Sequence, residues 1–141
     1  MSRTKLKDNE NKTPKVLVVD DNQQNLELLQ AYLEDMDCET VPATGALEAL
    51  DIVGSNPPDL ILLDVMMPKM SGFEVCRRIK NDPKTSGIPV IMVTALNEFG
   101  DIERGIDSGT DDFLSKPVNK LERTLAYLSE IEKQAQIAKS E

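Results

Sequence analysis

Five polar residues of this chain each stand at the end of a short apolar run: Asp20, Asp21, Asp64, Thr94 and Lys116. Ligands of an open parallel sheet bind beyond the carboxyl ends of its strands. If the apolar runs are neighbouring parallel strands, three carboxylates, a hydroxyl group and an ammonium group meet in one pocket. This set of groups indicates magnesium binding and phosphoryl-group chemistry.

The three carboxylates suit magnesium and a phosphoryl group together. Magnesium prefers hard oxygen ligands and is usually held by one or two carboxylates, with water and phosphate as its other ligands. Asp20 and Asp21 are adjacent, and both can reach one cation where a strand turns into a helix. Asp64 is the candidate nucleophile, because a carboxylate can attack phosphorus when magnesium offsets the repulsion between the anions.

Thr94 and Lys116 could complete the pocket with a hydroxyl donor and a positive charge for phosphoryl oxygens. Taken singly, each residue is better explained structurally. Thr94 could cap the end of its strand, and Lys116 could be an ordinary exposed lysine. The functional interpretation of these two residues therefore depends on the whole set.

Short β-type runs alternate with segments of helical periodicity from Val16 onward, a pattern typical of βαβ units around a parallel sheet. The five expected strands are residues 16–19, 39–41, 60–63, 90–93 and 113–115. The expected helices carry apolar residues at Leu26, Leu29, Leu33 and Met36, across 46–53, at Phe73, Cys76 and Ile79, at Ile102 and Ile106, and at Leu121, Leu125, Leu128 and Ile131. Asp21-Asn22 can cap the first helix. The predicted fold class is therefore an α/β doubly wound sandwich of five strands and five helices.

The chain is expected to hold one domain between two short extensions. Its 141 residues are enough for one hydrophobic core. We predict that residues 1–14 form a flexible polar tail, residues 15–131 the domain, and residues 132–141 a helical C-terminal extension. The extension has too few apolar residues to indicate a coiled coil. A phosphorylation-dependent homodimer is a hypothesis that this overhanging helix motivates.

Composition argues against several classes of protein. The net charge of −9 disfavours direct binding to nucleic acid or to an anionic membrane. No apolar stretch approaches the roughly 20 residues that span a bilayer, and the polar start does not resemble a secretion signal, so a cytoplasmic protein is expected. The two cysteines, Cys38 and Cys76, have no CxxC spacing and are expected to be buried thiols. Because the chain has no histidine, a phosphoryl donor must come from another molecule.

Four stretches of the chain, in this order, are typical of one protein family. They are VVDDN at 18–22, LLDVMMP at 62–68 with Ser71-Gly72, VTA at 93–95 and DFLSKP at 112–117. Through them the chain resembles the receiver domain of two-component response regulators, roughly over residues 15–128. Residues 75–90 look most like receivers that are attached to diguanylate cyclases. The resemblance implies a flavodoxin-like receiver fold with the strand order 2-1-3-4-5, flanked by five helices.

The resemblance also implies roles for the acidic residues. Asp64 would accept a phosphoryl group from a sensor histidine kinase or a phosphotransfer protein, in a reaction that requires Mg²⁺. Asp21 would bind the ion directly and Asp20 through water, and the backbone carbonyl of Met66 would complete the protein ligands.

A further set of implied roles concerns the switch. Thr94 and Lys116 would hold the phosphoryl oxygens, and the ring of Phe113 would swing inward when Thr94 is drawn to the phosphate. The surface of the fourth helix, fifth strand and fifth helix would then change for a downstream partner or a missing output domain. Such a domain is not an enzyme beyond its own phosphorylation and dephosphorylation.

Three positions are noteworthy against the family pattern. Thr110 stands where these domains usually carry alanine, which could shift the loop before Phe113. Met66 and Leu96 flank the route of the hydrolytic water in the family, and neither side chain can orient a water molecule through a strong polar group. We therefore predict a long-lived phosphoryl form.

Two alternative functions stay open. A phosphorylation-independent, receiver-like binding module would share the fold, although such domains usually lose one of the acidic or lysine positions and none is lost here. A magnesium-dependent aspartyl phosphohydrolase would need a second aspartate two residues after the nucleophile, and position 66 is methionine. The chain could act as a stand-alone regulator or as the receiver of a longer protein.

Overall fold

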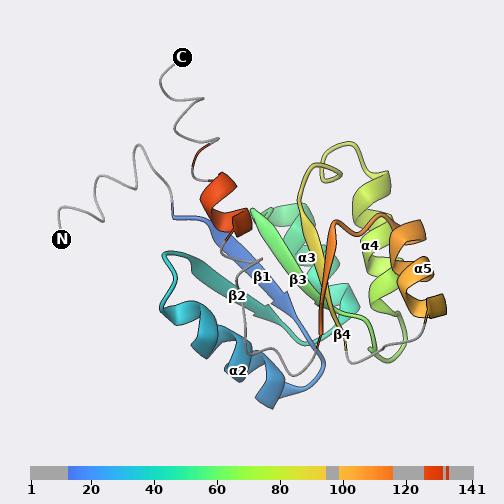
Figure 1. The fold of residues 1–141 in the computed structure, drawn as a ribbon, viewed down its shortest axis with the longest axis horizontal. Helices are drawn as coiled ribbons and strands as arrows, with labels where there is room; N and C mark the ends of the chain where they lie inside the picture. Colours follow the sequence, from blue (N-terminus) through green and yellow to red (C-terminus); the bar gives the residue numbers. More distant parts are fainter. Residues whose placement is uncertain (1–12, 95–98, 116–125, 132, 134–141) are drawn as a thin grey trace.

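Five parallel strands form one sheet in the order β2-β1-β3-β4-β5 (Figure 1). The computed structural model describes residues 13–94, 99–115, 126–131 and 133. The strands are β1 (Lys15–Val19), β2 (Glu39–Ala43), β3 (Leu60–Asp64), β4 (Val90–Thr94) and β5 (Asp112–Ser115). The helices are α2 (Gln23–Glu34), α3 (Ala46–Ser55), α4 (Gly72–Asn81) and α5 (Phe99–Ser108), and residues 126–131 are also helical. The predicted fold class and strand order are confirmed.

The central strands are apolar along their length because both of their faces are covered. Residues 16–19 of β1 and 60–63 of β3 are at most 1% exposed. Parallel sheets that are covered on both faces give such unbroken apolar runs. Since successive side chains of a strand point to opposite faces, each central strand contributes to two separate layers of the core.

Helices α3, α4 and α5 lie on one face of the sheet, and α2 lies on the other together with the helical residues 126–131 (Figure 1). Ala49 of α3 and Phe73 of α4 belong to the core layer on the first face. Leu26 of α2 and Leu128 belong to the layer on the second face. Burial of this apolar surface holds the strands in register, so their carboxyl ends meet at one edge.

The edge strand β2 is longer than the sequence pattern predicts. The expected strand is residues 39–41, but β2 pairs with β1 as far as Ala43. Pro42 has no backbone N–H to donate, and proline is therefore found in sheets mainly on edge strands. Because β2 pairs with no strand other than β1 among the described residues, the proline is tolerated at this position.

The first helix begins as predicted and ends earlier. Asn22 is its N-cap, and its side-chain Oδ1 accepts the backbone N–H of Asn25 at 3.1 Å. Helix α2 ends at Glu34, so Met36 lies outside it. The backbone N–H of Met36 donates to the carbonyl of Leu33 at 2.9 Å, a turn that leads the chain toward β2.

Helix α5 is present, but its two isoleucines do not face the core. Ile102 is 42% exposed and Ile106 is 62% exposed. Among residues 102–108, for which burial is described, the buried positions are Gly105 and Ser108. Small residues on the inner side allow a helix to lie close to its neighbours, so the apolar periodicity of this helix does not mark its buried side.

Several predicted features fall outside the described residues. They are Leu96, Lys116, Leu121 and Leu125, residues 1–12 of the predicted tail, and all but Lys133 of the predicted extension 132–141. Leu128 is buried and Ile131 packs against the same core layer, as the predicted stripe of the last helix requires. In the part of the chain that the structure describes, no helix is long and apolar enough to cross a membrane.

Both cysteines are free thiols, and they differ in burial. Cys76 is fully buried between the sheet and α4, as predicted, whereas Cys38 is only half-buried. Burial raises the pKa of the Cys76 thiol above its ordinary value of 9.0. Burial and, to a smaller extent, the nearby Asp37 carboxylate raise the pKa of Cys38. Since the thiolate is the reactive form, neither thiol is activated at neutral pH.

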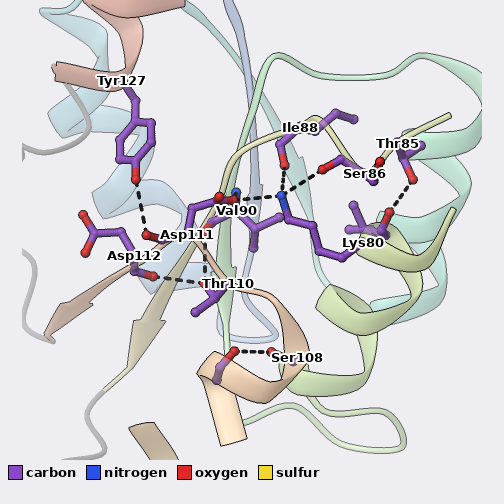
Figure 2. A network of polar contacts seen from close by, with 12 residues as sticks. Lys80, Thr85, Ser86, Ile88, Val90, Ser108, Thr110, Asp111, Asp112 and Tyr127 are labelled. Carbon is purple, nitrogen blue, oxygen red and sulfur yellow. Dashed lines mark hydrogen bonds and ion pairs between the residues drawn. The ribbon is translucent and has the colours of Figure 1, made fainter. Parts of the chain in front are cut away.

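A polar network joins the end of α4 to the starts of β4 and β5, at the sheet edge opposite the carboxyl ends (Figure 2). The Lys80 ammonium group donates to the carbonyl oxygens of Ile88 at 2.7 Å and Ser86 at 3.2 Å, and it lies 2.8 Å from the Asp111 carboxylate. The same carboxylate accepts the backbone N–H of Val90 at 2.7 Å. The three donors of the lysine therefore each have an acceptor.

Replacement of Lys80 by methionine should destabilise the fold. Lys80→Met keeps most of the length of the side chain and removes the donor that two carbonyls and a carboxylate share, an effect of about 1–3 kcal/mol on the free energy of unfolding. Urea denaturation measures it. Lys84→Met is the control, because Lys84 is exposed. Equal midpoints for the two variants would contradict a stabilising role of the network.

Candidate functional site

The structure brings Asp20, Asp21 and Asp64 together at the carboxyl edge of the sheet. One ligand oxygen of each residue lies within 4.8 Å of those of the other two. Asp20 directly follows β1, and Asp64 is the last residue of β3, the neighbouring strand. The strand order reverses between β1 and β3. This is the switch point at which open α/β sheets bind ligands.

The turn from β1 into α2 separates the roles of three consecutive residues. Asp20 is 1% exposed, and one of its carboxylate oxygens accepts the backbone N–H of Asn22 at 2.9 Å. Asn22 in turn caps the helix through its side chain. Asp21, between them, is exposed at the mouth of the site. Of the two predicted capping residues, Asn22 is therefore the N-cap of α2, and the exposed carboxylate of Asp21 is available to a ligand.

The electrostatics of this cluster favour a bound cation. Asp64 is 3% exposed, and Asp20 is equally buried beside it. Neighbouring carboxylates repel one another, and burial strengthens the repulsion because little water remains to screen it. A divalent cation offsets that repulsion. The donor set of three carboxylate oxygens fits Mg²⁺, which is held by hard oxygen ligands and keeps some of its water.

The loop after Asp64 is folded tightly against the core. Val65 and Met67 are buried, whereas Met66 between them is 64% exposed. The backbone N–H of Gly72 donates to the carbonyl of Val65 at 3.0 Å and closes the loop. Lys69 adopts a φ of 72°, a left-handed conformation that non-glycine residues rarely take. Met66 follows Asp64 by two residues, and its side chain lies in solvent between two buried neighbours.

The start of α4 makes an unusually close approach to the site. A Cβ atom added at Gly72 would overlap the backbone carbonyl oxygen of Asp64 and lie 2.9 Å from the Cα atom of Val65. Only glycine allows this contact, so Gly72 sets how near α4 comes to the end of β3. The residue before it, Ser71, is the N-cap of α4.

Two further predicted residues lie on the strands beside the cluster. Thr94 is the last residue of β4 and pairs with Ser115 of β5, so its backbone stands at the same edge of the sheet. Phe113 lies on β5 opposite Met92, and its ring packs against the core layer beneath α5. Lys116, which follows β5, is outside the described residues.

Two contacts of α5, one with α4 and one with β5, involve residues that helical periodicity did not indicate. The guanidinium group of Arg104 lies 4.3 Å from the centroid of the Phe73 ring, a cation–π contact between the two helices. The ring of Phe113 lies against Gly105. Neither contact is apparent in the sequence, because an exposed arginine and a helical glycine are both common without such a role.

The fold and the acidic site define a receiver of the kind found in two-component signalling. Residues 16–128 match the response regulator receiver domain family. The chain belongs to this family, and its function is that of a phosphorylation-controlled signalling receiver. Receiver domains generally bind Mg²⁺ at an acidic pocket, and this chain has a cluster of three aspartates at the carboxyl edge of its sheet.

Individual relatives agree with this assignment. The chain is 48% identical over 105 residues to the response regulator PleD of Caulobacter vibrioides, an alignment that covers 74% of this chain and 23% of PleD. It is 40% identical over 107 residues to the polar-differentiation response regulator DivK of Brucella ovis, which covers 76% of this chain and 87% of DivK. The chain thus spans less than a quarter of the first of these relatives and most of the second.

Solved structures share the fold as well. The signal receiver domain of a signal transduction histidine kinase from Syntrophus aciditrophicus superposes with a TM-score of 0.77 at 32% sequence identity. The match covers 86% of this chain and 92% of that one. The family predicted from the four sequence stretches is confirmed.

Proposed function

We propose that Asp64 is the phosphoryl acceptor of this receiver and that a sensor histidine kinase or a phosphotransfer protein is the donor. The observation that carries the proposal is the convergence of Asp64 with Asp20 and Asp21 at the switch point of the sheet. A carboxylate oxygen of Asp64 attacks phosphorus, the bond from phosphorus to the donor imidazole nitrogen breaks, and the imidazole leaves with the electron pair. The reaction needs no residue of this chain as a proton donor.

In this proposal the other residues of the site hold Mg²⁺ and the phosphoryl oxygens. Asp21 binds the ion directly, Asp20 acts through water, and the backbone carbonyl of Met66 supplies a further oxygen. When bound, Mg²⁺ neutralises the negative charge that keeps a phosphoryl donor away from three carboxylates. Thr94 and Lys116 hold the oxygens of the transferred group.

The switch of the proposal runs through Thr94 and Phe113. The phosphoryl group draws Thr94 toward Asp64 and favours the inward position of the Phe113 ring, the position against Gly105 that this structure shows. The surface formed by α5, β5 and the helix that contains residues 126–131 then changes its affinity for a downstream partner or an output domain. A cytoplasmic location and a phosphorylation-dependent homodimer are part of the same proposal, and the residues 132–141 that motivated the homodimer lie outside the described residues, apart from Lys133.

Loss of one metal ligand tests the magnesium site. Asp21→Asn should weaken Mg²⁺ binding by at least about tenfold, which corresponds to about 1.4 kcal/mol, because the exposed carboxylate is the one aimed at the ion in our proposal. Calorimetric titration with MgCl₂ measures the affinity, and the rate of phosphorylation by acetyl phosphate should become dependent on higher Mg²⁺ concentrations. Asp51→Asn on α3 is the control, because Asp51 is an exposed aspartate outside the cluster. Equal affinities for both variants would remove Asp21 from the metal site.

The phosphoryl group should be long-lived on the isolated domain. Met66 has an exposed, apolar side chain next to the acceptor loop, so it cannot hold a water molecule in line for hydrolysis. We expect the phosphorylated protein to persist for minutes after the phosphodonor is removed, and Met66→Asn to shorten that lifetime. Intact-mass spectrometry over time follows the decay. Decay of the wild-type phosphoryl group within seconds would contradict this prediction.

A further inference from the structure

The ring of Phe113 occupies the space that a side chain at position 105 would need. A Cβ atom added at Gly105 would overlap the Cζ atom of Phe113 and lie 2.6 Å from Cε1 of the same ring. It would also lie 3.3 Å from the sulfur of Met92, the residue that pairs with Phe113 across β4 and β5. The ring in this position and a side chain at residue 105 therefore exclude one another.

The backbone of α5 is fixed at Gly105. The carbonyl of Gly105 accepts the hydroxyl group of Ser108 at 2.7 Å (Figure 2) and the backbone N–H of Thr110 at 3.2 Å. The Thr110 hydroxyl group lies 3.0 Å from the carbonyl oxygen of Val90, which ties this turn to β4. Helix α5 is thus held to the sheet from its C-terminal end.

The position before Gly105 holds the same helix to its other neighbour. Arg104 lies over the ring of Phe73, a buried residue at the start of α4. The ring of Phe113, by contrast, is only partly buried at the edge of the core layer. When a side chain is added at Gly105, the ring of Phe113 therefore has more freedom to move than the helix has.

We infer that Gly105 is a positioning residue for Phe113: it keeps a seat open in α5 into which the ring fits. The inference rests on the proposed function in one respect, namely that the position of the Phe113 ring reports phosphorylation of Asp64. A side chain at residue 105 fills the seat and holds the ring outward. Phosphorylation of Asp64 then proceeds, but it no longer draws the ring into the seat.

The test compares Gly105→Ala with Gly54→Ala. Gly54 also lies in a helix, α3, and an added Cβ atom would meet nothing within 4 Å. NMR spectra of protein labelled at the phenylalanine rings resolve Phe113, which is assigned by its loss in Phe113→Leu. We expect Gly105→Ala to move the Phe113 ring signals toward solvent-exposed values while the Phe73 signals stay in place. Gly54→Ala should change neither.

A rescue experiment shows whether the effect of Gly105→Ala depends on the ring of Phe113. Leucine lacks the ring atoms that overlap the added Cβ atom, so Gly105→Ala should lower the thermal midpoint in the wild-type background and not in the Phe113→Leu background. If the Phe73 signals move and the Phe113 signals do not, the helix has given way and the inference is wrong. It is also wrong if neither ring moves, or if Phe113→Leu gives no rescue.

The same samples keep this inference apart from the proposed function. Intact mass after treatment with Mg²⁺ and acetyl phosphate reports phosphorylation of Asp64, and the ring signals report the seat. In the wild type, phosphorylation should shift the Phe113 signals further toward those of the seated ring, and in Gly105→Ala the mass gain should persist without that shift. A displaced ring in Gly105→Ala, together with a wild-type protein that takes up no phosphoryl group, would refute the proposed function and leave the seat established. A full signal shift in phosphorylated Gly105→Ala would overturn the inference alone.

Discussion

Incubation of the wild-type protein with Mg²⁺ and acetyl phosphate should add one phosphoryl group to its intact mass, and Asp64→Asn should abolish the gain. The amide of asparagine has nearly the shape of the carboxylate but is not a nucleophile toward phosphorus. Asp64 is the buried carboxylate at the end of β3, with Asp20 and Asp21 grouped around the same point. The expected loss is complete, because in our proposal Asp20 and Asp21 serve the bound Mg²⁺ and do not attack phosphorus.

The loss in Asp64→Asn should occur without unfolding. Removal of one of three neighbouring negative charges reduces their mutual repulsion, so the thermal midpoint in the absence of Mg²⁺ should not fall. Asp51→Asn is again the matched control and should take up the phosphoryl group as the wild type does. Retention of the mass gain in Asp64→Asn would show that another residue is the acceptor. No gain in any variant, with Mg²⁺ binding confirmed by calorimetry, would favour the phosphorylation-independent binding module.

Much of the fold could be predicted because the central strands are covered on both faces. That environment demands unbroken apolar runs, as in residues 60–63, and such runs are visible without a structure. The grouping of Asp20 with Asp64 follows from the same rule, since parallel strands have their carboxyl ends at one edge. Where one face of an element is less constrained, prediction was weaker: β2 extends past Pro42, and Met36 lies beyond α2.

The close approaches around the site could not be predicted from one sequence. Gly72 and Gly105 act through the space that a missing side chain leaves, and that space belongs to other segments of the chain. Helical periodicity drew attention to Ile102 and Ile106, whose side chains are exposed, rather than to the small residue between them. A sequence pattern shows the type of each side chain. A close contact at a glycine depends instead on how the helices and strands pack against one another.

Gly72→Ala should damage both the stability of the fold and the chemistry of the site. Among the described glycines only Gly109 has a positive φ, so alanine can adopt the backbone conformation of residue 72 and its effect comes from the contact alone. The added methyl group would overlap the backbone of Asp64, and backbone atoms cannot rotate away. We expect a loss of about 1–3 kcal/mol in the free energy of unfolding, as for other overpacked sites.

The matched control for Gly72→Ala is Gly54→Ala, which adds the same methyl group where nothing lies within 4 Å. Alanine is the better helix former, so Gly54→Ala should stabilise the protein by up to roughly 1 kcal/mol. Urea denaturation therefore should move the two variants in opposite directions. Equal stabilisation by both would mean that α4 moves freely away from β3.

Stability and phosphorylation rate, measured together for Gly72→Ala, distinguish a glycine that positions Asp64 from one that only allows α4 to pack. Relief of the overlap requires either α4 or the carboxyl end of β3 to shift, and Asp64 is the residue at that end. A displacement of a reacting group by a fraction of an ångström misaligns in-line attack, so the rate of phosphorylation by acetyl phosphate should fall by roughly tenfold or more. If stability falls and the rate does not, helix α4 alone has moved, and Gly72 serves the packing of the helix without positioning the acceptor.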